Sequence, residues 1–180
     1  MNDPKVNELL HTQRIDVEKL SQKELYDSFS ALDGQMRVIY NFVLAYMDYI
    51  NERHNYTAEE SLTMLEAHLL TQICDEPNTT VTALAKAWHR STSATSQTIR
   101  NLIKKDLIYR ENSKEDAKVF FLRPTEKGVR VSDAHKRYDT LDTVKTLKTL
   151  HHQLNDEEID ALFKGLSFYC QLLYEGKNHK

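Results

Sequence analysis

Small polar side chains and an arginine gather on one face of the helix predicted for residues 93–105. The apolar residues Ile99, Leu102 and Ile103 repeat at helical spacing, so their face packs inward. The opposite face carries Ser93, Ser96, Gln97 and Arg100. Such side chains approach base edges closely and exchange hydrogen bonds with them in the major groove of DNA, whereas bulky apolar groups would hold the backbone away. For this helix alone, a solvated polar face is an equally consistent interpretation.

The neighbouring segments favour the DNA interpretation. A short helical pattern at 82–89 precedes this helix across a turn at 90–92. Two β-favouring runs follow at 107–110 and 119–122, and the segment between them is almost entirely polar. The order predicts a helix-turn-helix followed by a hairpin with a charged tip, which is a winged helix-turn-helix. We therefore expect a mainly α fold with a small β-wing.

From residue 62 to residue 128 the chain resembles the MarR family of transcriptional regulators. The matching landmarks are Leu62-Thr63-x-x-Glu66, Thr82-x-Leu84, Ser96 to Leu102, Leu107-Ile108-x-Arg110, Asp116 and Thr125-x-x-Gly128. Their fixed order and spacing carry the resemblance, since no single landmark is specific. The resemblance implies a homodimer with two recognition helices that read a palindrome. It also implies that DNA affinity often falls when a small ligand binds.

Four positions depart from the family pattern. Asp106 stands where glycine is usual, Lys118 where a wing arginine is usual, and Pro124 where leucine is common. Aspartate adopts the left-handed conformation at modest cost, so we expect the turn after the helix to survive. Lysine keeps the charge but loses the planar fork of arginine. Arg100 replaces a residue that is often acidic and adds positive charge near the groove.

The predicted DNA contacts fall into two groups. We expect contacts to base edges or nearby phosphates from Thr92, Ser93, Ser96, Gln97 and Arg100. We expect phosphate or minor-groove contacts from Arg90, Lys104, Lys114 and Lys118. Positive charge is concentrated in this region: residues 80–130 hold 11 Lys or Arg against 5 Asp or Glu, within a chain whose net charge is −3. A basic segment in an acidic chain attracts phosphate through one face only.

Two helical regions outside the motif predict dimerisation. Apolar residues recur every three or four positions from Ser21 to about Glu52, which indicates a long amphipathic helix. Two further helices are predicted at 126–152 and after Asn155, which is placed as an N-cap with Glu158. These helices have little to cover in one chain of 180 residues. Packing against a second copy would bury them, and a self-contained helical bundle is the alternative.

The predicted organisation has four parts. They are an N-terminal arm at 1–20, an N-terminal dimerisation helix at 21–56, the winged helix-turn-helix at 57–128 and C-terminal dimerisation helices at 129–180. We expect a loop at 51–57. The arm is either partly ordered across a dimer or disordered, and its sequence does not decide between the two.

The resemblance also implies a cleft for a small ligand. Tyr40, Tyr46, His68 and Trp88 are the candidate lining residues, because aromatic bodies with polar tips suit phenolic or planar molecules. Each of these residues is equally consistent with an ordinary core aromatic.

We expect no metal site and no cofactor, since no His-x-x-x-His pair occurs and the histidines are scattered. Cys74 and Cys170 are predicted to be buried thiols without a disulfide.

The sequence thus predicts a homodimeric, sequence-specific DNA-binding regulator, a repressor relieved by a small ligand. Its partners would be double-stranded DNA with a palindromic operator and a second copy of itself. With no phosphate loop, nucleophile elbow or metalloprotease motif, we expect no enzyme activity. With no apolar run of about 18 residues, we expect a cytoplasmic protein without membrane contact. The alternative is a winged-helix adaptor that contacts proteins and does not bind DNA.

Overall fold

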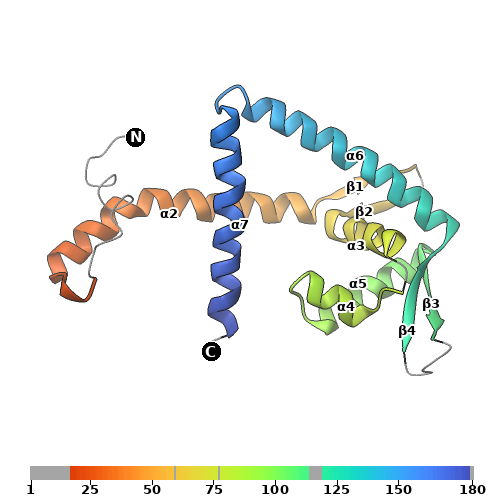
Figure 1. Cartoon of the computed structure of the whole chain (residues 1–180). Coiled ribbons are helices and arrows are strands. Elements are labelled where there is room, and N and C mark those ends of the chain that lie inside the picture. The colour runs from red at the N-terminus through yellow and green to blue at the C-terminus, as the bar shows by residue number, and fades with distance from the viewer. Residues whose placement is uncertain (1–16, 59, 77, 114–118, 179–180) are drawn as a thin grey trace. The chain divides into compact units, whose positions relative to one another are not determined.

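A computed structural model describes residues 17–58, 60–76, 78–113 and 119–178 (Figure 1). The chain divides into two compact units, one ending at Arg53 and the other beginning at His54. The fold is mainly helical with a small β-wing, as predicted. Most of the predicted arm at 1–20 lies outside the described residues, and its described part holds one helical turn, η1 (Val17–Lys19).

The first unit is built around one long helix, α2 (Gln22–Asn51). Its beginning is set by a capping box: Ser21 Oγ accepts from the Glu24 backbone N–H, and the Glu24 carboxylate accepts from the Ser21 backbone N–H. The helix predicted from Ser21 to about Glu52 is therefore confirmed. Large apolar side chains along it, among them Phe29, Val43 and Met47, are exposed.

A small sheet follows α2 in the chain, instead of the predicted loop. Strand β1 (Arg53–Asn55) pairs with β2 (Ser61–Thr63). The prediction of a loop at 51–57 was wrong for these positions because Arg, His and Asn show no strand periodicity. Their strand conformation comes from pairing with β2, whose Leu62 is fully buried.

Three helices follow, and each begins at a hydroxyl residue that caps it. Helix α3 (Met64–Asp75) starts after Thr63, which forms a capping box with Glu66. Thr80 caps α4 (Val81–Ala87), and Ser91 caps α5 (Thr92–Lys104). The hydroxyl oxygen accepts a backbone N–H that would otherwise have no partner in the first turn. These N-caps fix where each of the three helices begins.

The core of the second unit joins these helices to the wing and to the next helix. Its fully buried side chains come from seven elements and the turn after α5: Leu62, Leu69, Leu70, Ile73, Leu84, Ile99, Leu102, Leu107, Ile108, Leu122 and Val131. The helix-turn-helix is thus a packed body, which gives the outward face of α5 a fixed setting.

The wing is the antiparallel hairpin of β3 (Ile108–Asn112) and β4 (Phe120–Pro124), in the register Ile108 to Pro124 and Asn112 to Phe120. Asp106 precedes it with φ 57°, which confirms the expected left-handed turn. The backbone N–H of Leu122 donates to the Thr79 carbonyl at 2.9 Å and ties β4 to the α3–α4 connection. The wing therefore has a fixed origin on the helix-turn-helix.

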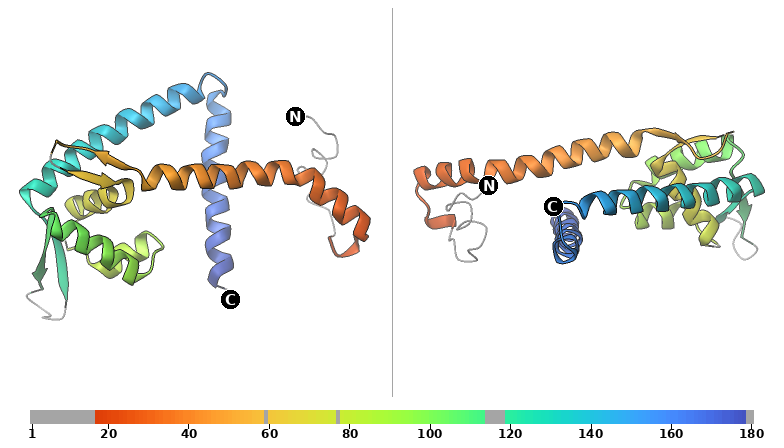
Figure 2. Two further views of the ribbon diagram at one scale, coloured as in Figure 1. Left: turned by 180° about the vertical axis from the view of Figure 1, so that it is seen from behind. Right: turned by 90° about the horizontal axis from the view of Figure 1, so that it is seen from above.

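Two long helices complete the unit, α6 (Glu126–Leu150) and α7 (Asp156–Asn178). Asn155 Oδ1 accepts from the Glu158 backbone N–H and the Glu158 carboxylate accepts from the Asn155 N–H, as predicted from the sequence. Figure 2 shows α7 leaving the end of α6 in a new direction. Near the end of α7, the Tyr174 ring stacks on His89, with 3.9 Å between ring centroids.

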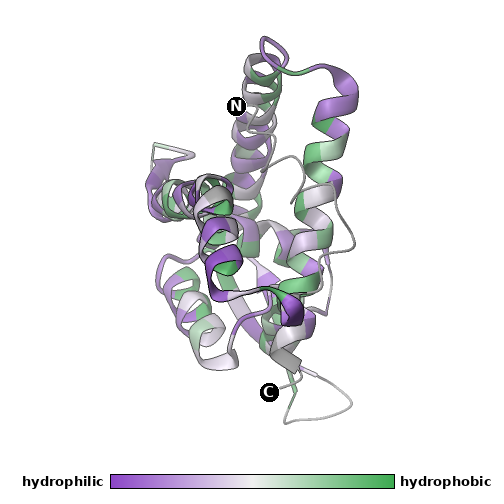
Figure 3. Cartoon of the chain, turned by 90° about the vertical axis from the view of Figure 1, so that its left-hand side faces the viewer, coloured by the Kyte–Doolittle hydropathy of each residue, from purple (hydrophilic) through white to green (hydrophobic). Residues whose placement is uncertain are grey.

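Apolar side chains on α6 and α7 are exposed in the single chain. They are Val129, Tyr138, Leu141, Val144, Leu162, Phe163, Leu166, Phe168, Tyr169, Leu172, Leu173 and Tyr174. Figure 3 shows hydrophobic positions recurring along the long helices. Cys74 is half-buried, and Cys170 is exposed in one chain because the apolar face of α7 has no cover there; burial of Cys170 in a dimer stays a prediction. Within the described residues, no helix combines the length and apolar character needed to cross a bilayer.

Candidate nucleic-acid interface and histidine cluster

The outward face of α5 is the first component of the site. The helix buries Thr95, Thr98, Ile99 and Leu102 against the core. Thr92, Ser93, Gln97, Arg100 and Lys104 are exposed, and Ser96 is half-buried. This division places the predicted base-reading residues on one solvent-facing side of one helix, as the spacing required.

The turn before α5 fixes the entry of this helix. His89 takes a left-handed conformation with φ 48°, and the Arg90 N–H donates to the Ala85 carbonyl at 2.9 Å. This closes the end of α4 in the manner of a left-handed C-cap. Arg90 is exposed beside the Ser91 cap, so a cation lies at the start of the recognition helix.

Hydrogen bonds order the polar face of α5. Arg100 donates to the Gln97 side-chain oxygen, and Gln97 Nε2 donates to Asn101 Oδ1 at 3.4 Å. Asn101 in turn donates to Glu66 on α3 at 3.5 Å. The guanidinium of Arg100 is thus held along the helix face in the absence of DNA.

A basic hollow between α5 and β3 extends this face. It has a volume of about 520 Å³ and is lined by Arg100, Ile103, Lys104, Tyr109 and Arg110. Tyr109 and Arg110 were not among the predicted DNA contacts. Their signal is present in the sequence, since Tyr109 and Arg110 come directly after Leu107-Ile108, the apolar pair that enters the wing. Three cations around an open hollow suit a phosphate backbone.

The base of the wing is braced by Arg123 on β4. Its Nε donates to Glu111 at 2.6 Å, and its Nη2 donates to Asn78 at 2.9 Å. Asn78 itself has φ 68°. The predicted wing-tip contacts Lys114 and Lys118 lie outside the described residues.

A second cluster forms where α3 meets α6. Donor atoms of His68, His135 and Asp139 all lie within 4.8 Å of one another. His135 and Asp139 are four residues apart on α6 and so share a face. Sequence spacing did not link these residues, because the cluster pairs one histidine of α3 with two residues of α6. Two imidazole nitrogens and a carboxylate oxygen are a donor set that Zn²⁺ accepts.

Hydroxyl groups hold the His135 ring. Its Nδ1 lies 3.0 Å from Thr71 Oγ1, which accepts from Ser132 Oγ at 3.2 Å. Burial, and to a smaller extent the charge of the nearby His68, lower the pKa of His135 to about 4. The imidazole is therefore neutral at pH 7. With Nδ1 engaged by Thr71, Nε2 is the nitrogen available to an ion.

Aromatic rings enclose this cluster. The Tyr56 ring lies edge-on to His135 at 5.0 Å and to Tyr138 at 5.3 Å. The Tyr56 hydroxyl is buried and makes no hydrogen bond to the part of the chain that is described. Burial raises the pKa of Tyr56 to about 12, with smaller contributions from Tyr138 and Asp139. The histidines thus sit in an apolar surrounding that strengthens their interactions with charge.

Two of the four predicted ligand-lining residues belong to this region. His68 is half-buried and its ring lies 5.8 Å from the Trp88 ring. Tyr40 and Tyr46 lie on α2 in the first unit, where both are exposed. The ligand cleft therefore stays a prediction.

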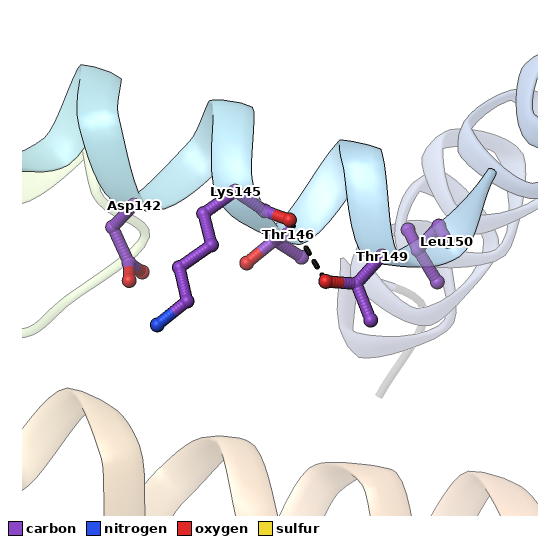
Figure 4. A pocket seen from close by; sticks show the side chains of 5 residues that line it. All are labelled: Asp142, Lys145, Thr146, Thr149 and Leu150. Carbon is purple, nitrogen blue, oxygen red and sulfur yellow. Dashed lines mark hydrogen bonds between the residues drawn. The ribbon is translucent and has the colours of Figure 1, made fainter. Parts of the chain in front are cut away.

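Another hollow follows α6 and has a volume of about 260 Å³ (Figure 4). Its lining comes from Asp142, Lys145, Thr146, Thr149 and Leu150. Thr149 Oγ1 donates to the Lys145 backbone carbonyl at 2.9 Å. All of these residues lie on α6, so this hollow does not bring side chains of different elements together.

Acidification should destabilise the second unit through His135. The folded chain holds its pKa at about 4, against an ordinary value of 6.5. Between pH 6.5 and pH 4, His135 is therefore protonated in the unfolded chain but neutral in the folded chain. Because the unfolded state binds the extra proton, the free energy of unfolding falls as the pH drops through this range. We expect His135→Gln to remove about 1–3 kcal/mol of this pH dependence. Urea unfolding in the presence of a chelator at pH 7 and pH 4.5 measures this difference. If the free energy of unfolding changes equally between the two pH values in parent and variant, His135 is not the group responsible.

The comparisons with known proteins agree with this architecture. Residues 62–120 match the model of the MarR family. No protein of curated function matches the chain in sequence.

Solved structures share the fold. One is FabT from Streptococcus pneumoniae in complex with DNA, with a TM-score of 0.59 and 23% identity over 82% of this chain and 98% of FabT. Another is the adhesin competence repressor AdcR from Streptococcus pyogenes, with a TM-score of 0.59 and 22% identity over 79% of this chain and 97% of AdcR. A further AdcR structure, described as a zinc-dependent regulator in the Zn(II)-bound state, has a TM-score of 0.56 and 21% identity over 79% and 97% of the two chains.

Proposed function

Because the chain carries the winged helix-turn-helix of the MarR family, we propose that it is a sequence-specific transcriptional regulator that binds a palindromic operator as a homodimer. The exposed polar face of α5 carries this proposal. Ser93, Gln97 and Arg100 face solvent from a helix whose other side is buried in the core. The basic hollow beside it supplies phosphate contacts, and the protein acts by binding and not by catalysis.

The uncovered apolar surface supports the homodimer. Large apolar side chains along α2, α6 and α7 are exposed in one chain, among them Phe29, Leu141 and Phe163. Burial of such a surface against a second copy is favourable in proportion to the apolar area removed from water. A two-fold axis would set two recognition helices about 34 Å apart, which is one turn of DNA.

We propose further that the regulator is a repressor whose DNA affinity responds to a small effector, and that this effector is a divalent metal ion. The specific observation is the cluster of His68, His135 and Asp139. Its donors fit Zn²⁺, which imidazole nitrogens and carboxylate oxygens would hold. Neutral His135, held by Thr71, has the orientation that metal-binding histidines need. When bound, the ion would neutralise the carboxylate and link α3 to α6.

Equilibrium dialysis of the full chain against Zn²⁺ tests the metal centre. We expect one saturable site per chain in the parent. His68→Gln should weaken binding by at least about tenfold, and exposed His152→Gln should leave it unchanged. Equal binding by His68→Gln and the parent would overturn the metal centre without affecting the proposal of DNA binding.

Binding to DNA is the test of the main proposal. Purified protein is titrated with a genomic fragment from upstream of its own gene and with a shuffled fragment, at two salt concentrations. Preferential binding that weakens steeply with salt supports the regulator. No preference on that fragment and on a random-sequence selection would favour the alternative, a winged-helix adaptor that contacts proteins.

Replacing Arg100 with alanine should weaken operator binding by about 5–100-fold, because a guanidinium contact to a base edge or phosphate contributes about 1–3 kcal/mol. Arg100 is exposed, so folding should be unchanged. Lys148→Ala, an exposed cation near the end of α6, is the matched control and should bind as the parent does. Fluorescence anisotropy with a labelled operator measures both. If Arg100→Ala binds as tightly as the parent, Arg100 is not a contact.

A further inference from the structure

Trp88 lies at the junction between α4 and the turn that leads into the recognition helix. It is the C-cap residue of α4, with φ −97° and ψ 10°. Only His89, with its left-handed backbone, and Arg90 separate it from Ser91, the N-cap of α5. Because the backbone of this turn is closed by hydrogen bonds at both ends, a displacement of Trp88 is passed directly to the first turn of α5.

The side chain of Trp88 reaches back to α3 and makes two contacts there. Its indole Nε1–H donates to Gln72 Oε1 at 2.6 Å. Its ring lies 5.8 Å from the His68 ring at an interplanar angle of 40°. His68 and Gln72 are four residues apart on one face of α3, so the indole covers that face.

His68 in turn lies between Trp88 and His135. The ring centroids of the two histidines are 4.7 Å apart, with an edge-on angle of 87°. The Tyr56 ring also contacts His135, edge-on at 5.0 Å. The effector cluster and the helix-turn-helix turn are thus joined by ring contacts through a single imidazole.

Ligation would alter the position of this imidazole. The donor atoms of His68, His135 and Asp139 lie within 4.8 Å of one another. A zinc ion held by these donors would tie one ring nitrogen of His68 to His135 and Asp139 on α6. The orientation of the His68 ring, and with it the ring's contact with the indole, would then depend on whether the ion is bound.

We infer that Trp88 is a positioning residue that passes the ligation state of His68 to the turn before the recognition helix. This inference rests on the proposed metal effector and on DNA binding by α5. Gln72 keeps the indole on α3 while His68 moves, since its own Nε2 donates to Glu76 at 2.9 Å and fixes the orientation of its amide. The indole then tilts about this hydrogen bond and carries the backbone of the turn with it.

Trp88 is the one tryptophan of the chain, so its fluorescence reports this contact directly. The full-length protein is titrated with Zn²⁺ while emission is recorded, with bound zinc followed by dialysis. We expect a saturable change in the intensity or wavelength of emission that follows zinc occupancy and is lost in His68→Gln. Zinc that binds without any change in emission would overturn the inference.

Linkage to DNA provides the functional readout. Operator affinity is measured with and without Zn²⁺ for the parent, Trp88→Leu and Phe121→Leu. The Phe121 ring lies on β4, 5.8 Å from the guanidinium carbon of Arg123, so Phe121→Leu is a matched loss of one aromatic ring outside the row of rings from Trp88 to Tyr56. We expect zinc to change parent affinity by about tenfold and Phe121→Leu to keep that change. In Trp88→Leu the ratio of operator affinities with and without zinc should fall below about twofold, while zinc affinity stays near the parent value.

The outcomes separate the inference from the proposals beneath it. A full zinc-dependent change in Trp88→Leu overturns the role of Trp88 and leaves the metal effector intact. If the parent binds DNA but no zinc, the proposal of a metal effector is overturned. If the parent binds no DNA, the proposal of a regulator is overturned. Either result also overturns this inference. If Trp88→Leu fails to fold, Gln72→Met removes the acceptor of the indole N–H together with the exposed hydrogen bond to Glu76, and it should reduce the zinc-dependent change relative to the parent. An unchanged response in Gln72→Met would then overturn the inference.

Discussion

Replacing Gly128 with alanine is expected to destabilise the winged helix-turn-helix by about 3 kcal/mol or more, because it overpacks a site that cannot yield. A Cβ at this position would lie 1.9 Å from the Leu107 carbonyl oxygen and 2.9 Å from its carbon. These are backbone atoms, and that carbonyl accepts from the Thr125 N–H at 3.0 Å and from its hydroxyl at 3.2 Å. Leu107 is fully buried, so neither partner can move aside.

Urea unfolding of the full chain measures this loss. Gly165→Ala on α7 is the matched control, since a Cβ there meets nothing within 4 Å. In a helix interior that exchange is expected to stabilise by up to about 1 kcal/mol. If Gly128→Ala unfolds at the same urea concentration as the parent, Gly128 of α6 does not lie as close to the Leu107 backbone as described.

Replacing Glu60 with glutamine is expected to cost about 1–3 kcal/mol, because its carboxylate joins two lysines from different elements. It accepts from Lys105 Nζ at 3.0 Å and from Lys127 Nζ at 2.6 Å, and its side chain is only 10% exposed. Lys105 caps the end of α5, and Lys127 belongs to the first turn of α6. The substitution leaves two ammonium groups facing each other without the anion, and it should also weaken operator binding by loosening the end of the recognition helix.

The pH dependence of Glu60→Gln gives an independent check. Burial opposes ionisation, but hydrogen bonds and charges from both lysines outweigh it and hold the pKa of Glu60 below its ordinary value of 4.5. The stabilisation is therefore present above pH 4.5 and is lost as pH falls through the folded pKa. Unfolding curves of parent and variant should converge in that acidic range. Glu111→Gln, at the more exposed ion pair with Arg123, is the control and should cost less than about 1 kcal/mol.

Local signals in the sequence were sufficient for the ends of most elements. The pairs Thr63 with Glu66 and Asn155 with Glu158 act over three residues, so a capping box can be read from spacing alone. The left-handed turn at Asp106 follows from its place between an amphipathic helix and a β-favouring run. The outward face of α5 follows from helical period in the same way, because each signal depends on neighbours along the chain.

Long-range contacts could not be predicted. Arg53, His54 and Asn55 form a strand only because β2 lies beside them. The exposure of Cys170 depends on which surface packs against α7, and the sequence of α7 does not identify that surface. The sequence by itself determined a winged helix-turn-helix with a basic reading face, since period, caps and turn residues act locally. Only the tertiary structure brought His68, His135 and Asp139 together and set Trp88 against His68, because packing of α3 on α6 and α4 decides which side chains meet across the fold.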